Sequence, residues 1–169
     1  MFRKTNIPWW AWLLLLKIAY VVCLAFFHPQ ACFSTDAYGY LTMAENIWNF
    51  GTSSRNELPP LLFDTLRTPG YPLFIILTGG LYSVWFTVMA QQLVHVLAAF
   101  CLYKLIKHFQ VSEKVAKLAA GIYLLDIPSF VISTFLLSDI LFQALLVFSF
   151  FFLLKKQSLW WSAIMLVLA

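Results

Sequence analysis

The chain has 169 residues, of which 62% are hydrophobic and 11% are charged, and its formal net charge is +4. A water-soluble domain of this length has too little interior to bury so much apolar surface, so the composition excludes an ordinary soluble enzyme and predicts that lipid is the main solvent. The basic residues do not gather on a polar domain, so the positive charge does not indicate a nucleic-acid partner.

The first apolar segment covers residues 9–27 and follows Arg3 and Lys4. It is about as long as a full membrane span and longer than the apolar part of a signal peptide, and no A-x-A cleavage site follows it. We therefore predict a retained transmembrane helix. Lys17 lies inside this segment, and because a lipid-facing charge is costly, we expect its side chain to face other helices or a wet cavity.

A polar region covers residues 28–68 and carries four of the seven acidic residues. Between Asp36 and Gly51, apolar residues recur at helical spacing along one face, which predicts an amphipathic helix on the membrane surface with Gly51 as its C-cap. Asp36 falls at the start of this helix. It is either the N-cap, a role that Ser34 or Thr35 can also fill, or a catalytic or metal-binding carboxylate.

The polar region ends in the run Arg67-Thr-Pro-Gly-Tyr-Pro-Leu-Phe74. Its two prolines around Gly70 predict a turn followed by the start of a helix. The run is either a rigid re-entry into lipid or a site in which Arg67 binds phosphate, since a guanidinium group suits bidentate recognition of phosphate. The apolar segment 71–82 is too short for a full span, so we predict a re-entrant or interfacial helix.

Further apolar segments follow at 84–103, 117–134, 138–154 and 158–169, and the last has too few apolar residues to cross a bilayer. If 71–82 does not span, the positive-inside rule places the N-terminus and the lysine clusters in the cytoplasm and the polar region outside. The clustered lysines are Lys104, Lys107, Lys114, Lys117, Lys155 and Lys156.

The predicted fold is therefore an all-α integral membrane protein with about four transmembrane helices plus a partial fifth. Its first outer loop, residues 28–70, is expected to hold the amphipathic helix and the start of the short re-entrant or interfacial helix. Residues 1–169 are interpreted as a single transmembrane domain. Because the last apolar segment is short, we expect this domain to be the N-terminal part of a larger fold.

The motifs that carry a resemblance to a known family are Asp36-Ala-Tyr38-Gly-Tyr40, Ala44, Gly51, the run Arg67–Phe74 and, further along, the run Leu136–Phe142. In their order and spacing, the motifs up to Phe74 resemble the first outer loop of GT-C-type glycosyltransferases. Within that class, the chain is similar to the bacterial relatives of protein O-mannosyltransferases and lipid A aminoarabinose transferases, which are multi-span enzymes. A second match is Asp139, which corresponds to the family's acidic residue at the outer start of the fourth span; otherwise it is a helix cap or a solvated residue at the interface.

The resemblance implies a glycosyltransferase of the bacterial inner membrane, with a cytoplasmic N-terminus and its site on the periplasmic face. The donor is then a polyprenyl-phosphate-linked sugar, and the acceptor a lipid, glycan or protein. Asp36 is implied as the catalytic base, and Arg67, Tyr40, Tyr71 and Asp139 as substrate-binding residues. The resemblance leaves open whether the site uses a divalent metal, for which Asp36 and Asp139 are the candidate ligands.

Two other classes of function stay open. Because the resemblance covers only the front part of the family's fold, the chain is alternatively a truncated relative that acts as a non-catalytic membrane scaffold or partner. The other class is a transporter of lipid-linked sugars. Transporters usually place broken helices at the bilayer midplane in paired repeats, whereas this chain has one short Gly/Pro-interrupted segment near one face and no repeat.

Overall fold

The computed structural model describes residues 8–55, 68–154 and 159–168, and every regular element in these ranges is a helix. The sequence-based predictions also concern five residues outside these ranges, namely Arg3, Lys4, Arg67, Lys155 and Lys156. The helices are α1 (Trp9–Phe27), α2 (Thr35–Phe50), α3 (Gly70–Leu77), α4 (Val84–His108), α5 (Glu113–Leu125), α6 (Ile127–Ile132), α7 (Asp139–Leu154) and α8 (Leu159–Leu168).

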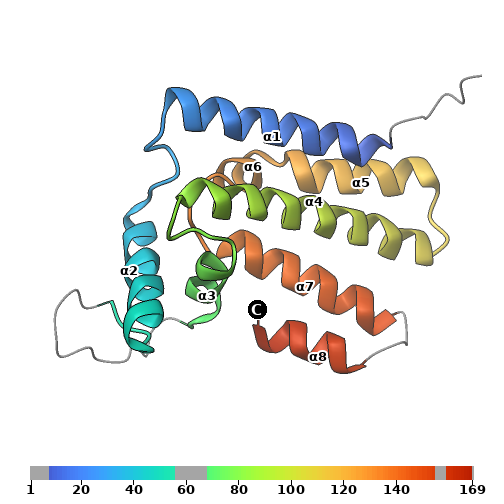
Figure 1. The fold of residues 1–169 in the computed structure, drawn as a ribbon. Helices are drawn as coiled ribbons and strands as arrows, with labels where there is room; N and C mark the ends of the chain where they lie inside the picture. Colours follow the sequence, from blue (N-terminus) through green and yellow to red (C-terminus); the bar gives the residue numbers. More distant parts are fainter. Residues whose placement is uncertain (1–7, 56–67, 155–158, 169) are drawn as a thin grey trace, which may run out of the picture.

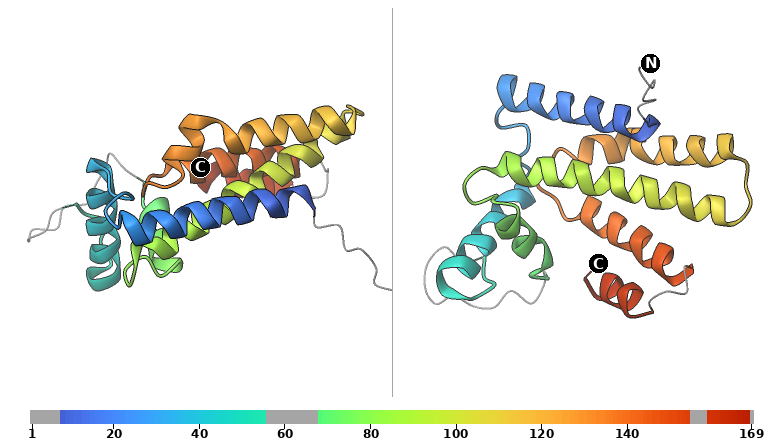
Figure 2. Two further views of the ribbon diagram at one scale, coloured as in Figure 1. Left: turned by 90° about the horizontal axis from the view of Figure 1, so that it is seen from above. Right: turned by 45° about the vertical axis from the view of Figure 1, so that its right-hand side comes forward.

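The long helices run side by side, with α4 packed against α1, α5 and α7, and α8 packed against α7 (Figure 1). Helices α2 and α3 pack together at one end of this bundle, and α2 runs across it rather than along it (Figures 1 and 2). We call this end, at which α1 ends and α4 and α7 begin, the α2 end. The other end, at which α4 ends and α5 begins, is called the opposite end.

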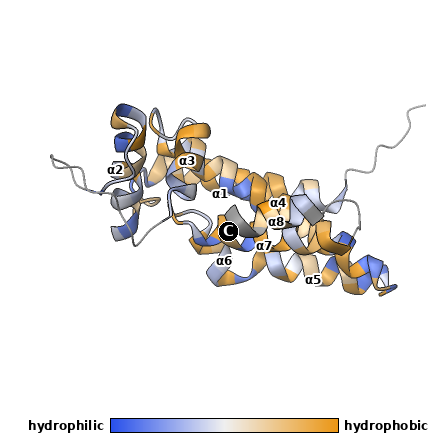
Figure 3. Cartoon of the chain, turned by 90° about the horizontal axis from the view of Figure 1, so that it is seen from below, coloured by the Kyte–Doolittle hydropathy of each residue, from blue (hydrophilic) through white to orange (hydrophobic). Residues whose placement is uncertain are grey.

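Two of the described helices are long and apolar enough to cross a membrane, namely α1 with 19 residues and α4 with 25, while α7 is apolar but shorter. Helix α1 exposes Trp12, Leu15 and Phe26 to 59%, 53% and 80%. Figure 3 shows hydrophobic residues along most of the bundle and hydrophilic ones on α2 and at the start of α5. Such an extensive exposed apolar surface is typical of contact with lipid or with further helices.

The apolar segment predicted over residues 117–134 forms two helices, because the helix breaks at Asp126. Helix α5 ends at Leu125, and the Asp126 side chain then accepts a hydrogen bond from the backbone N–H of Ser129 at 3.2 Å, which caps α6. Pro128 in the first turn of α6 favours a new helix start over a continuing helix. The segment therefore forms two short helices.

The amphipathic helix predicted between Asp36 and Gly51 is confirmed as α2. Its N-cap is Ser34, whose hydroxyl accepts the N–H of Ala37 at 3.2 Å, and Gly51 ends it in the left-handed conformation with φ 69°. Of the two interpretations of Asp36, the structure therefore excludes the N-cap. Asp36 instead lies exposed in the first turn, where the helix dipole favours a negative charge.

Lys17 faces the interior of the bundle, as its place in an apolar helix predicts. Its side chain is only 2% exposed, and its Nζ lies 3.0 Å from Gln92 Oε1, 3.2 Å from Ser133 Oγ and 3.2 Å from His95 Nδ1. The same ammonium group lies 4.8 Å from the ring centre of Phe130. These contacts join α1 to α4, to α6 and to Ser133, which follows α6.

The three cysteines differ in burial. All three are free thiols; Cys32 is buried, Cys101 is half-buried, and Cys23 is exposed on α1. Burial raises the pKa of the Cys32 thiol to about 11, so this group stays protonated at neutral pH.

Candidate functional site

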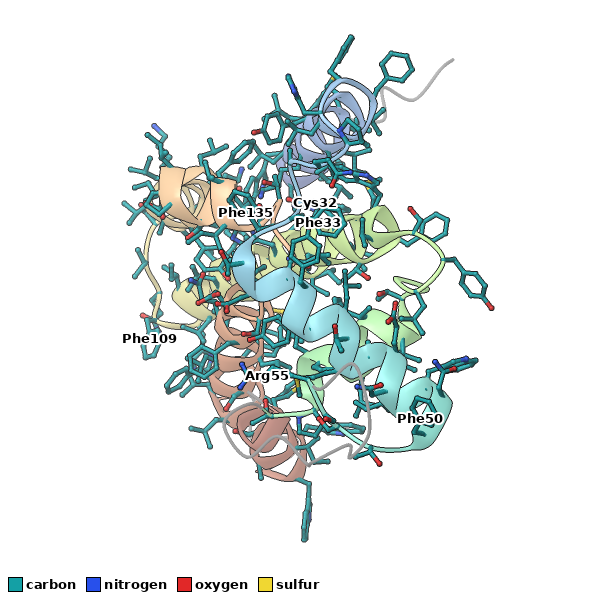
Figure 4. The ribbon with its side chains drawn as sticks, turned by 90° about the vertical axis from the view of Figure 1, so that its left-hand side faces the viewer. Cys32, Phe33, Phe50, Arg55, Phe109 and Phe135 are labelled. Atoms are coloured by element: carbon teal, nitrogen blue, oxygen red, sulfur yellow. The ribbon has the colours of Figure 1, made fainter. Side chains whose placement is uncertain are left out.

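The candidate site lies at the α2 end, where α2 and α3 meet the segment that leads into α7. Tyr40 of α2 and Ser138, the residue before α7, share a hydrogen bond of 2.9 Å between their hydroxyl oxygens. The N–H of Leu136 donates to the carbonyl oxygen of Cys32 at 3.0 Å. Figure 4 shows Cys32 beside Phe135 at the start of α2. The entrance to α7 is therefore fixed against the first turns of α2.

A cavity of about 220 Å³ opens between α3 and the start of α7. It brings together Tyr71 and Asp139, two of the residues that the sequence resemblance implies for substrate binding. Asp139 is exposed, so its carboxylate is available to a ligand in the cavity. The residues that line the cavity are Thr68, Tyr71, Ser138, Asp139, Leu141, Phe142 and Leu145.

Tyr71 is held rigidly at the inner wall of this cavity. It is 3% exposed, its hydroxyl donates to Gln91 Oε1 at 2.6 Å, and its ring packs edge-to-face on Tyr40 at 4.8 Å between ring centres. Burial, with smaller contributions from the neighbouring Tyr40, Cys32 and Asp139, raises the pKa of the Tyr71 phenol. The phenol therefore stays protonated and keeps its hydrogen bond at physiological pH.

Gln91 links the two walls of the site, and no sequence motif singled it out. Its Oε1 accepts from Tyr71, and its Nε2 donates to the carbonyl oxygen of Phe135 at 3.0 Å. The next residue, Gln92, donates to the carbonyl oxygen of Ser133. Two adjacent amides on α4 therefore anchor the segment 133–138 that precedes Asp139. Their only signal in the sequence is a polar pair within an apolar span.

Asp36 belongs to α2, the helix that borders this region, and does not line the cavity. It precedes Tyr40 by about one helical turn, and Tyr40 is bonded to the residue next to Asp139. The two carboxylates thus lie on elements that contact each other. Among the described residues, no three His, Cys, Asp or Glu side chains gather into a cluster able to hold a metal ion.

The sequence points to Arg67 as the cation of the site, and this residue lies outside the described ranges. A second arginine, Arg55, lies against α2: a Cβ added at Gly39 would stand 3.4 Å from its Cδ atom. Gly39 is three residues from Asp36, and Figure 4 shows Arg55 beside this helix. The α2 end therefore combines two carboxylates, a buried tyrosine and an exposed guanidinium group.

Comparisons with protein families, with curated proteins and with solved structures found no match for this chain.

Proposed function

We propose that the protein is a GT-C-type membrane glycosyltransferase that moves a sugar from a polyprenyl-phosphate donor to a lipid, glycan or protein acceptor. The observation that carries this proposal is the cavity beside Tyr71 and Asp139, which opens at the end of the bundle crossed by the helix of Asp36. The residues named by the resemblance are far apart in sequence and, where described, belong to adjoining elements.

The proposed topology places the α2 end on the outer, periplasmic face and the N-terminus in the cytoplasm. Helix α3 has eight residues, which corresponds to a length of about 12 Å, far less than the bilayer core of about 30 Å. The chain therefore returns to the α2 end before α4 begins. This agrees with the distribution of lysines, which favours the opposite end as cytoplasmic.

In the proposed mechanism, Asp36 acts as general base. Its carboxylate takes the proton of the acceptor nucleophile while that nucleophile attacks the anomeric carbon, and the bond between this carbon and the donor phosphate breaks with its electron pair leaving on the phosphate. Arg67 binds this phosphate, Tyr40 and Tyr71 contact the substrates, and Asp139 orients the acceptor. A divalent ion at Asp36 and Asp139 is compatible with this scheme but is not required by it.

The test is Asp36→Asn, assayed as transfer of labelled sugar from the polyprenyl-phosphate donor in membranes that contain the protein. Loss of the base is expected to lower the rate on the order of 10²- to 10⁴-fold. Glu45→Gln is the matched control, because Glu45 is an exposed carboxylate on the same helix, and it is expected to leave the rate unchanged. Undiminished transfer by Asp36→Asn would sink the assignment.

A further inference from the structure

A second cavity, of about 410 Å³, lies at the opposite end of the bundle between α4 and α7. Its walls are of two kinds. Phe100, Leu105, Phe151 and Leu154 form an apolar part, and basic side chains of the last turns of α4 form the rest. Cavities of this size are typical of sites for small ligands.

The basic part of this cavity consists of Lys104, Lys107 and His108. Lys104 is exposed, and its Nζ lies 5.4 Å from the ring centre of Phe100, so its charge sits directly over the apolar wall. Lys107 is half-buried and donates to the carbonyl oxygen of Val111 at 3.4 Å.

Within the described part of the chain, no carboxylate forms an ion pair with either Lys104 or Lys107. Glu113 is the carboxylate whose charge acts on Lys107, and it is paired with Lys117 instead. The cavity therefore carries positive charge that a ligand can neutralise.

We propose that this cavity binds an anionic glycerophospholipid, with the phosphate at Lys104 and Lys107 and one acyl chain along Phe100 and Phe151. The ligand must be both anionic and apolar, because the charged groups and the aromatic walls belong to one cavity. Basic pockets between the ends of membrane helices bind anionic lipid headgroups in this way.

The position of the cavity in the fold favours a lipid over a soluble anion. It lies beside the last turns of α4, one of the two described helices that are long and apolar enough to span a membrane, so it falls where the acyl region of a bilayer meets the headgroups. On the topology proposed above, this is the cytoplasmic face. The inference needs the membrane location but not the glycosyltransferase activity, and the site lies at the other end of the bundle from Asp36.

The test is native mass spectrometry of the detergent-purified chain, titrated with dioleoyl phosphatidylglycerol or with dioleoyl phosphatidylcholine. We expect phosphatidylglycerol to bind more tightly than the zwitterionic lipid with the same chains. Lys104→Gln and Lys107→Gln are each expected to weaken phosphatidylglycerol binding about fivefold, and the double variant about 25-fold. Phe151→Ala is expected to weaken the binding of both lipids, because it removes an apolar wall.

Lys114→Gln is the matched control, since Lys114 is exposed nearby on α5 but does not line the cavity. An equal loss in this control would show general surface attraction and overturn the proposal, as would equal affinity for the two lipids. Tight binding of glycerol 3-phosphate, which has no acyl chain, would also contradict it. Asp36→Asn is expected to bind phosphatidylglycerol like the unmodified chain, so a loss of sugar transfer and a loss of lipid binding are separable.

Discussion

At the scale of single residues, the buried polar side chains decide how the helices are joined. The sequence predicts that Lys17 faces inward, because a charge in an apolar helix avoids lipid. It does not reveal the partners of Lys17, which lie 75 to 116 residues away. The same is true of Gln91, whose role depends on Tyr71 and Phe135 reaching it from two other segments.

The contact between Lys17 and Gln92 is expected to show energetic coupling. Lys17→Met and Gln92→Leu each leave buried polar groups without a partner, so each is expected to lower the free energy of unfolding by about 1–3 kcal/mol. The double variant is expected to lose less than the sum, by about 0.5–2 kcal/mol. Unfolding in mixed micelles by sodium dodecyl sulfate measures all three values, and simple additivity would show that the two side chains do not interact.

Asp139 and Asp36 are expected to differ in their kinetic roles. Because Asp139 lines the cavity and is proposed to orient the acceptor, Asp139→Asn is expected to raise the acceptor KM about tenfold with a smaller change in kcat. Asp36→Asn is expected to lower kcat instead. Steady-state transfer rates over a range of acceptor concentrations separate the two effects. An unchanged KM in Asp139→Asn would remove this residue from acceptor binding.

At the scale of elements, the sequence predicted helix ends that depend on neighbouring residues. The bounds of α2 follow from its periodicity and from Gly51, and the structure agrees within one residue at the N-terminus. The break at Asp126 does not show in the hydropathy of the segment 117–134, because the surrounding apolar residues dominate its average. The helix nevertheless ends there, because the Asp126 side chain caps a new helix and Pro128 favours a helix start.

The turn from α3 to α4 is expected to tolerate no side chain at position 80. A Cβ there would lie 2.6 Å from Ile75 Cγ2, 3.0 Å from the Ile75 carbonyl oxygen and in closer contact with the Thr87 hydroxyl. Gly80→Ala is therefore expected to lower the free energy of unfolding by about 1–3 kcal/mol, since packed helices must move apart.

Gly121→Ala is the matched control for this prediction. A Cβ at Gly121 meets nothing within 4 Å, and alanine is the better helix former by about 1 kcal/mol, so this variant is expected to be neutral or more stable. Both variants are compared by the same detergent-unfolding measurement. Equal stability of the two would contradict the close approach of the turn to α4.

At the scale of the whole molecule, the two ends of the bundle differ in chemistry. The α2 end holds Asp36, Tyr71 and Asp139 on three adjoining elements, while the opposite end holds a basic cavity. Composition and the lengths of the apolar segments predicted an all-helical chain with apolar surfaces. The resemblance implied that Asp36, Tyr71 and Asp139 share a site. The contacts that join α2, α3 and the start of α7 could not be predicted, because they are tertiary hydrogen bonds that leave no pattern in the sequence.

The proposed glycosyltransferase depends on one central claim, namely that the two ends lie on opposite sides of a membrane with the α2 end outside. The proposed lipid site needs the first part of this claim, the location in a membrane. The topology is tested with two substitutions, Asn49→Cys on α2 and Val115→Cys on α5. Both residues are exposed, and neither substitution changes a charge. Each is introduced into a chain whose native cysteines are alanine, and a membrane-impermeant maleimide is added to intact cells. We predict that Asn49→Cys is labelled at once and Val115→Cys only after permeabilisation; labelling of both from one side, or the reverse order, would contradict the account.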